Sequence, residues 1–174
     1  MTSSFLQDII KNIDNEYASL ADDGIAAGDT SGYIDTGSYI FNALVSGSIF
    51  GGIPSNKITA LAGESSTGKT FFTISVMKHF LETHPEAGVA FFESEGAISR
   101  ELLADRGVDV KRVVIIPVVT VQEFRKQALL VADNLLKDKN HPPMLFVLDS
   151  LGMLSTSKEI EDSEAGKETR DMTR

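Results

Sequence analysis

The chain has 174 residues, of which 42% are hydrophobic and 24% charged, and its formal net charge is −9. This composition predicts one soluble domain with a single core, and the absence of Cys excludes disulfides and thiolate metal sites. The negative charge excludes a surface that is basic throughout, so nucleic acid would have to bind a local element.

The N-terminal residues and the apolar runs bear on the compartment. The chain opens Met-Thr-Ser-Ser, without a basic region before an apolar run, so we expect no secretory signal. The longest apolar run, at residues 113–121, is too short to cross a membrane and is interrupted by Pro117. We therefore expect a cytoplasmic protein that does not bind membranes.

Apolar residues recur at three- and four-residue steps through the first 20 positions, which predicts an amphipathic helix. These residues are Phe5, Leu6, Ile9, Ile10, Ile13, Tyr17 and Leu20. Residues 21–37 are rich in Asp, Gly, Ser and Thr and predict a linker with turns. The helix could pack on its own core or dock on a neighbouring subunit, and the pattern alone favours its own core.

From Lys57 onward, short apolar runs alternate with segments of helical spacing. The runs are residues 58–62, 89–92, 113–116 and 144–148, and the helical segments are residues 70–81, 98–106 and 121–136. Strands that are apolar at consecutive positions and separated by helices predict a mostly parallel sheet with helices on both faces. The expected fold class is therefore α/β.

Between the first run and the first of these helices, eight residues match the phosphate-loop pattern G-x-x-x-x-G-K-[ST]. They are Gly63, Glu64, Ser65, Ser66, Thr67, Gly68, Lys69 and Thr70. The glycines allow a tight turn whose N–H groups bind phosphate, and the following helix adds its positive end. Lys69 supplies a positive charge for the phosphates, and the Thr70 hydroxyl supplies an oxygen ligand for Mg²⁺. The sequence thus predicts a nucleotide site with Mg²⁺.

Acidic residues follow two of the other apolar runs. Asp149 ends the run at 144–148, and Glu93 and Glu95 follow the run at 89–92. The carboxyl ends of parallel strands meet at one edge of the sheet, where open α/β folds bind ligands. We expect Asp149 in the Mg²⁺ shell, and one glutamate as the residue that orients the attacking water. Spacing alone does not choose between Glu93 and Glu95.

Together these motifs resemble the RecA family, and in detail the UvsX-type recombinases of tailed phages. The resemblance covers residues 34–38, 51–54, 63–70, 93–98, 107–109, 148–152 and 171–174. It implies a RecA-like P-loop NTPase core at residues 34–174, preceded by a helix and linker at residues 1–33. It also makes that helix a subunit-docking segment, which favours docking on a neighbour over packing on its own core.

The resemblance implies an ATP-dependent DNA recombinase that forms filaments on single-stranded DNA for homologous recombination and repair. Its compartment would be the cytoplasm of the host cell if a phage encodes it. Lys69 and Glu95 fall on catalytic positions of this DNA-dependent ATPase, and Thr70 and Asp149 on the metal positions. Leu102 falls where bacterial members place an aromatic ring against adenine. Residues 155–170 fall on the first DNA-binding loop, although acidic residues outnumber basic ones there.

The sequence ends at Arg174, before the family's second DNA-binding loop and its γ-phosphate-sensing glutamine. We expect a truncated N-terminal fragment in which nucleotide binding is weakened and strand exchange is absent. A strand at residues 58–62 would then lose a neighbour and expose an edge. Two alternatives stay open: a RecA-fold motor of the helicase type, and a non-catalytic module that only self-associates.

Overall fold

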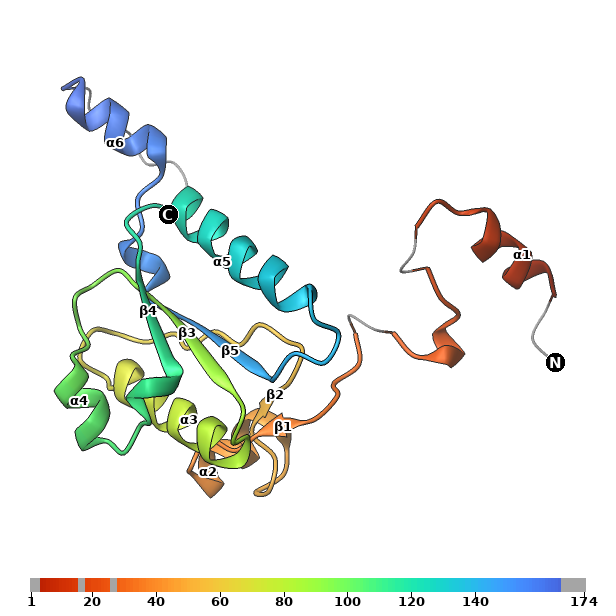
Figure 1. Cartoon of the computed structure of the whole chain (residues 1–174), viewed down its shortest axis with the longest axis horizontal. Coiled ribbons are helices and arrows are strands. Elements are labelled where there is room, and N and C mark those ends of the chain that lie inside the picture. The colour runs from red at the N-terminus through yellow and green to blue at the C-terminus, as the bar shows by residue number, and fades with distance from the viewer. Residues whose placement is uncertain (1–3, 16–17, 26–27, 167–174) are drawn as a thin grey trace. The chain divides into compact units, whose positions relative to one another are not determined.

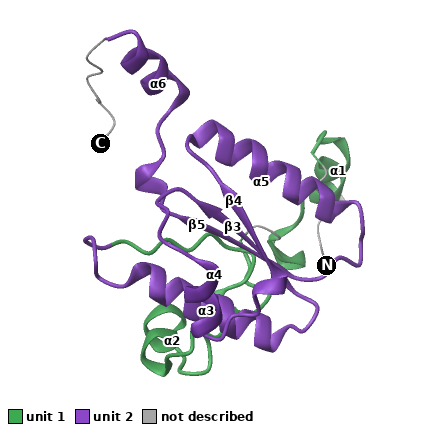
Figure 2. Ribbon diagram, turned by 60° about the vertical axis from the view of Figure 1, so that its left-hand side comes forward, with its two compact units in different colours: residues 1–62 green, residues 63–174 purple. Residues whose placement is uncertain are grey.

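The computed structural model describes residues 4–15, 18–25 and 28–166. The chain forms two compact units, Met1–Ala62 and Gly63–Arg174 (Figure 2). The expected helical position Tyr17 and the motif at residues 171–174 lie outside the described residues, as do Lys167, Glu168 and Arg170. No helix in the described part of the chain has the length and apolar character needed to cross a membrane.

The first unit begins with α1 (Ser4–Asn12) and a short 3-10 helix, η1 (Ala21–Asp23). The predicted helix over residues 5–20 is therefore wrong at the described residues beyond Asn12, which are 13–15 and 18–20. Asp14 and Asn15 are poor helix formers that favour turns, and the N–H of Ala18 donates to the carbonyl of Asn15 at 3.1 Å. Apolar spacing continued past the point at which backbone propensity ends the helix.

The expected linker at residues 21–37 also holds regular structure, because β1 (Tyr33–Ile34) pairs antiparallel with β2 (Ile53–Pro54). Between them lies α2 (Tyr39–Ser46). Asn42 on α2 is 1% exposed, and its Oδ1 accepts hydrogen bonds from N and Oγ1 of Thr36 at 3.0 and 2.7 Å. Gly52 has a φ of 138°, and a Cβ there would lie 2.0 Å from the carbonyl oxygen of Ile34, so only glycine fits.

The second unit holds a parallel sheet of three strands in the order β4-β3-β5. They are β3 (Gly88–Glu93), β4 (Val113–Pro117) and β5 (Met144–Asp149). The helices are α3 (Lys69–Thr83), α4 (Arg100–Asp105), α5 (Val121–Leu136), α6 (Ser157–Glu164) and the short η2 (Val110–Arg112) and η3 (Leu151–Met153). Helix α5 covers one face of the sheet, and α3 and α4 lie on the other (Figures 1 and 2). The predicted α/β fold class is confirmed.

The core of this unit follows the alternation of side chains along β3. Ala90 and Phe92 face α5, where the Phe92 ring meets the Phe124 ring edge to face at a centroid distance of 5.0 Å. Val89 and Phe91 are fully buried on the opposite face, the side of α3. Since both faces are covered, β3 is apolar at consecutive positions, which is why the strand could be predicted.

The expected strand at residues 58–62 is absent, so this prediction is wrong. Within the described residues no strand pairs with this segment, and Ile58 is fully exposed. A strand is defined by the hydrogen bonds of its neighbour, and an apolar segment without a neighbour gains none of them. The apolar pattern is present, but the pairing that would turn it into a strand is not.

Residues 155–170, expected as a loop, contain α6. Thr156 begins this helix with a reciprocal capping box, in which the Glu159 N–H donates to Thr156 Oγ1 at 3.2 Å. The Glu159 carboxylate accepts from the Thr156 N–H in return. This pairing satisfies two N–H groups that a helix start leaves open and explains why the segment is helical. Of the basic residues expected there, Lys158 lies on α6.

Arg112 ties the end of α3 to the start of β4. Its guanidinium donates to the carbonyl oxygens of Leu81 at 3.0 Å, His84 at 3.1 Å and Pro85 at 2.9 Å. Its Nε donates to Asp109 Oδ2 at 3.0 Å, and this bond holds the pKa of the Asp109 carboxyl below its ordinary value. Asp109 therefore contributes to stability at pH values above its ordinary pKa. This contribution is lost as the pH falls through the lowered pKa of the folded state.

Replacing Arg112 by Ala should lower the free energy of unfolding by about 2–3 kcal/mol, because carbonyls at the end of α3 lose a charged donor. Lys at this position should restore only part of the loss, since one ammonium cannot reproduce the forked geometry. Urea unfolding measures the effect, with Arg125→Ala on the exposed side of α5 as control. A loss below about 0.5 kcal/mol, the level of ordinary surface substitutions, would contradict the assignment.

Candidate functional site

The phosphate loop at residues 63–70 turns sharply before α3 begins at Lys69. Ser66 and Gly68 have positive φ angles of 64° and 90°, with Thr67 between them. Left-handed residues in such a turn direct successive backbone N–H groups to one side, which is the geometry of an anion-binding nest. The positive end of α3 follows directly, and these two features make the loop a candidate phosphate site.

The Lys69 ammonium closes the loop. Its Nζ donates to the carbonyl oxygens of Gly63 at 3.0 Å and Glu64 at 2.7 Å. The Thr67 hydroxyl also donates to the Glu64 carbonyl, at 2.8 Å. The positive charge therefore lies at the mouth of the nest, where phosphate oxygens could replace the carbonyl oxygens as its partners.

Thr70 and Asp149 lie together although 79 positions separate them in the sequence. The Thr70 hydroxyl donates to Asp149 Oδ2 at 2.6 Å, and Asp149 is only 9% exposed. Their oxygens are of the kind that Mg²⁺ prefers. Among the described residues, no group of three His, Asp or Glu side chains could hold a metal by itself. Two protein oxygens suit Mg²⁺ in a nucleotide site, because phosphates and water complete its shell.

Glu93, the last residue of β3, and Glu95, two residues further on, make different contacts. Glu93 Oε1 accepts hydrogen bonds from the backbone N–H groups of Glu95 at 3.2 Å and Ala97 at 2.9 Å. Glu95 Oε1 accepts one from the Ser150 hydroxyl at 2.7 Å. Glu93 thus folds the loop, whereas Glu95 contacts the residue after Asp149. Spacing left these two carboxylates equivalent, and the contacts distinguish them.

The sequence patterns did not single out the hydroxyls of Ser94 and Ser150. Each serine follows a strand directly, and the strand ends Glu93 and Asp149 are paired in register. Ser94 Oγ donates to the carbonyl oxygen of Ser150 at 2.8 Å. A signal was therefore present: a serine immediately after each of two strands that end in an acidic residue.

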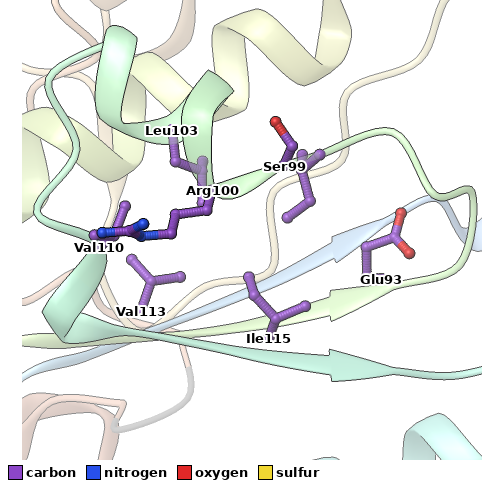
Figure 3. Close-up of a pocket in the computed structure, with 8 residues that line it drawn as sticks. Glu93, Ser99, Arg100, Leu103, Val110, Val113 and Ile115 are labelled. Atoms are coloured by element: carbon purple, nitrogen blue, oxygen red, sulfur yellow. The ribbon is translucent and has the colours of Figure 1, made fainter.

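Leu102, the residue expected near the base, is half-buried on α4, and its N–H donates to Ser99 Oγ at 3.1 Å. A cavity of about 240 Å³ lies between α4 and β4 (Figure 3). Among the labelled residues that line this cavity, the Glu93 carboxylate and the Arg100 side chain lie on opposite sides. The lining residues are Glu93, Ile98, Ser99, Arg100, Leu103, Val110, Val113 and Ile115.

The start of α3 and the end of α4 meet at a cation–π contact. The Arg106 guanidinium carbon lies 4.4 Å from the ring centroid of Phe71, the residue after Thr70. Phe71 is 49% exposed, so this contact adds about 0.5–1 kcal/mol at most. It orients α4, which carries Leu102, beside the helix that carries Lys69.

The chain is similar in sequence to known proteins. The RecA N-terminal domain matches residues 4–174. The recombination and repair protein of Enterobacteria phage T4 is 33% identical over 135 residues, which are 78% of this chain and 34% of that protein. Protein RecA of Campylobacter hominis is 32% identical and that of Aquifex aeolicus 31% identical, each over 128 residues, 71% of this chain and 34% of the relative.

The chain thus spans about a third of the length of these relatives. The match runs through the phosphate loop, the parallel sheet and the acidic strand ends, so it includes every residue of the candidate site. By the extent of this match and by its fold, the chain belongs to the RecA family, in the region of the RecA N-terminal domain.

Proposed function

We propose that this chain is the nucleotide-binding part of an ATP-dependent DNA recombinase, which forms filaments on single-stranded DNA during homologous recombination and repair. The observation that carries the proposal is the 2.6 Å contact between Thr70 and Asp149. It brings the end of a phosphate loop to the carboxyl edge of the sheet, where open α/β folds bind ligands. The name of the phage T4 relative, a recombination and repair protein, supports the pathway.

The residues have distinct roles in this proposal. Backbone N–H groups of residues 63–68 and the Lys69 ammonium bind the phosphates of ATP, and Leu102 contacts the base. Thr70 and Asp149 hold Mg²⁺, which neutralises charge on the phosphates when bound. Glu95 orients and deprotonates the attacking water. Phosphoryl transfer needs little beyond such positioning and charge stabilisation, so this set is sufficient in kind.

The N-terminal segment, residues 1–33, docks on a neighbouring copy, and residues 34–174 form the ATPase core. The support is the apolar face of α1, which is largely exposed. On α1, Phe5 is 67% exposed, Leu6 44% and Ile9 39%, and Ile13 just after the helix is 47% exposed. A helix with an uncovered apolar stripe is suited to bind another apolar surface.

Calorimetric titration of the chain with ATP in excess Mg²⁺ tests the central claim. We expect binding in the micromolar range, and removal of Mg²⁺ with EDTA should weaken it at least about 10-fold, because Thr70 and Asp149 act through the metal. The absence of binding with Mg²⁺ present would favour a non-catalytic self-associating module. Binding that EDTA leaves unchanged would refute the roles of Thr70 and Asp149.

Electron microscopy of the full-length protein with ATP and single-stranded DNA tests the assembly. Helical filaments are the expected result, and closed rings would favour a motor of the helicase type instead. Contacts between the protein and DNA neutralise phosphates. The affinity for single-stranded DNA should therefore fall by about 10-fold or more as salt is raised from 50 to 200 mM, and filament formation should decline with it.

A further inference from the structure

One side chain binds both backbone groups of a neighbouring residue at the ends of β3 and β5. Ser94 Oγ donates to the carbonyl oxygen of Ser150 at 2.8 Å and accepts from the N–H of Ser150, also at 2.8 Å. The N–H of Ser94 donates to the carbonyl oxygen of Asp149 at 3.0 Å. Ser94 thereby continues the pairing of the two strands past their last residues.

Ser150, held in this way, lies between the two acidic residues of the site. Its hydroxyl donates to Glu95 Oε1 at 2.7 Å. The preceding residue, Asp149, accepts a hydrogen bond from the Thr70 hydroxyl at 2.6 Å. Two hydrogen bonds, joined by the covalent link between Asp149 and Ser150, therefore connect the phosphate-loop helix through the end of β5 to the Glu95 carboxylate.

Glu95 needs such support because it is exposed and follows the end of its strand. An exposed glutamate side chain populates several rotamers, and holding it in one costs conformational entropy. The Ser150 hydroxyl selects one position, but only if Ser150 itself is fixed. Ser94 supplies that fixation, since it restrains both the N–H and the carbonyl of Ser150.

We propose that Ser94 is a positioning residue: through Ser150 it sets the place of the Glu95 carboxylate relative to Asp149. The inference rests on the proposed function, because it assumes that Glu95 orients the attacking water. The hydrogen bonds of Ser94 to Ser150 then serve to hold Glu95 in place for that role. Displacement of a reacting group by about 1 Å can cost on the order of 100-fold in rate. Ser94 itself contacts only Asp149 and Ser150 in this series and does not take part in the chemistry.

The test compares Ser94→Ala, which removes the hydroxyl, with Ser94→Thr, which keeps it. In the nucleotide-free chain, NMR should show that the Ser150 amide exchanges with solvent at least about 10-fold faster in the Ala variant, because its acceptor is gone. The Thr variant should exchange at the wild-type rate. This measurement reports on the hydrogen bond between the Ser150 N–H and Ser94 Oγ, and it requires neither nucleotide nor activity.

With nucleotide, Mg·ADP should bind Ser94→Ala within about 2-fold of wild type, because the phosphate loop is untouched. Binding of Mg·ADP with aluminium fluoride, which mimics the transferring phosphoryl group, should weaken about 10- to 100-fold. Thr should restore it. A purely structural role would weaken both ligands alike or lower the urea midpoint without separating them.

Equal weakening of Mg·ADP and its aluminium fluoride complex would overturn the positioning role, as would wild-type affinity for both in Ser94→Ala. If wild type itself fails to bind Mg·ADP, the proposed function fails, and this outcome is distinct because it needs no variant. Should Ser94→Ala not fold, Ser150→Ala replaces it. That variant removes only the bond to Glu95, and the same selective loss is expected.

Discussion

Replacing Lys69 by Ala should weaken binding of Mg·ATP by at least about 100-fold. The Lys69 ammonium lies over the loop, 3.0 Å and 2.7 Å from the carbonyl oxygens of Gly63 and Glu64, and is the positive charge that phosphate oxygens would meet. Hydrogen bonds between charged groups contribute about 1.5–3 kcal/mol each, and about 2.7 kcal/mol corresponds to 100-fold in affinity. Calorimetric titration of wild type and variant measures the difference directly.

Lys78→Ala is the matched control, because it removes the same charge from the same helix. Lys78 lies 3.8 Å from Glu82 in a surface ion pair and away from the loop, so its loss should change affinity less than about 2-fold. The urea midpoint of Lys69→Ala should stay near wild type, since the released carbonyls are exposed to water. Equal affinities of wild type and Lys69→Ala would remove the physical basis of the nucleotide site.

The sheet of the second unit was predictable because its strands are apolar at consecutive positions. Of the three strands only β3 is buried along most of its length, whereas Val114 and Ile115 of β4 are 57% and 42% exposed. The sequence predicts a strand at residues 113–116, and the structure has β4 at Val113–Pro117. The strand predicted at residues 144–148 corresponds to β5 at Met144–Asp149. Consecutive apolar residues between breakers such as Pro117 and Pro143 mark such strands at both ends. The placement of Asp149 at the sheet edge followed from the same pattern.

Residues 58–62 show the limit of that pattern. The run is apolar apart from Thr59. A strand also needs a hydrogen-bonded neighbour, and pairing is a property of the fold rather than of the segment. Helix α6 shows the converse. The capping box of Thr156 and Glu159 is visible in the sequence and favours a helix, whereas the family resemblance indicates a loop at this segment.

Side-chain contacts between strand ends could not be derived from spacing. Ser94 and Ser150 are 56 positions apart, and their hydrogen bonds depend on the register that pairs Glu93 with Asp149. The same register decides which glutamate approaches Ser150. A one-residue shift would exchange the directions in which the side chains of β5 project, so the different contacts of Glu93 and Glu95 exist only once the strands are paired.

The different contacts of Glu93 and Glu95 lead to a further prediction. In the full-length protein, Glu95→Gln should reduce the rate of ATP hydrolysis by about 100- to 10,000-fold, while the affinity for Mg·ATP stays within about 3-fold. Gln keeps an oxygen that can accept the Ser150 hydroxyl, so the position of the side chain is preserved. Gln lacks the carboxylate that, in the proposed function, accepts the proton of water. Single-turnover hydrolysis with excess protein, with and without single-stranded DNA, measures the rate after binding.

Glu93→Gln provides the matched comparison, two residues away with the same chemical change. Its amide oxygen can still accept from the N–H groups of Glu95 and Ala97, so the loop should keep its shape and hydrolysis should fall less than about 10-fold. The reverse result, a large loss with Glu93→Gln and little with Glu95→Gln, would make Glu93 the general base. Because both variants retain their hydrogen-bond acceptors, the difference between them isolates the proton transfer from the folding of the loop.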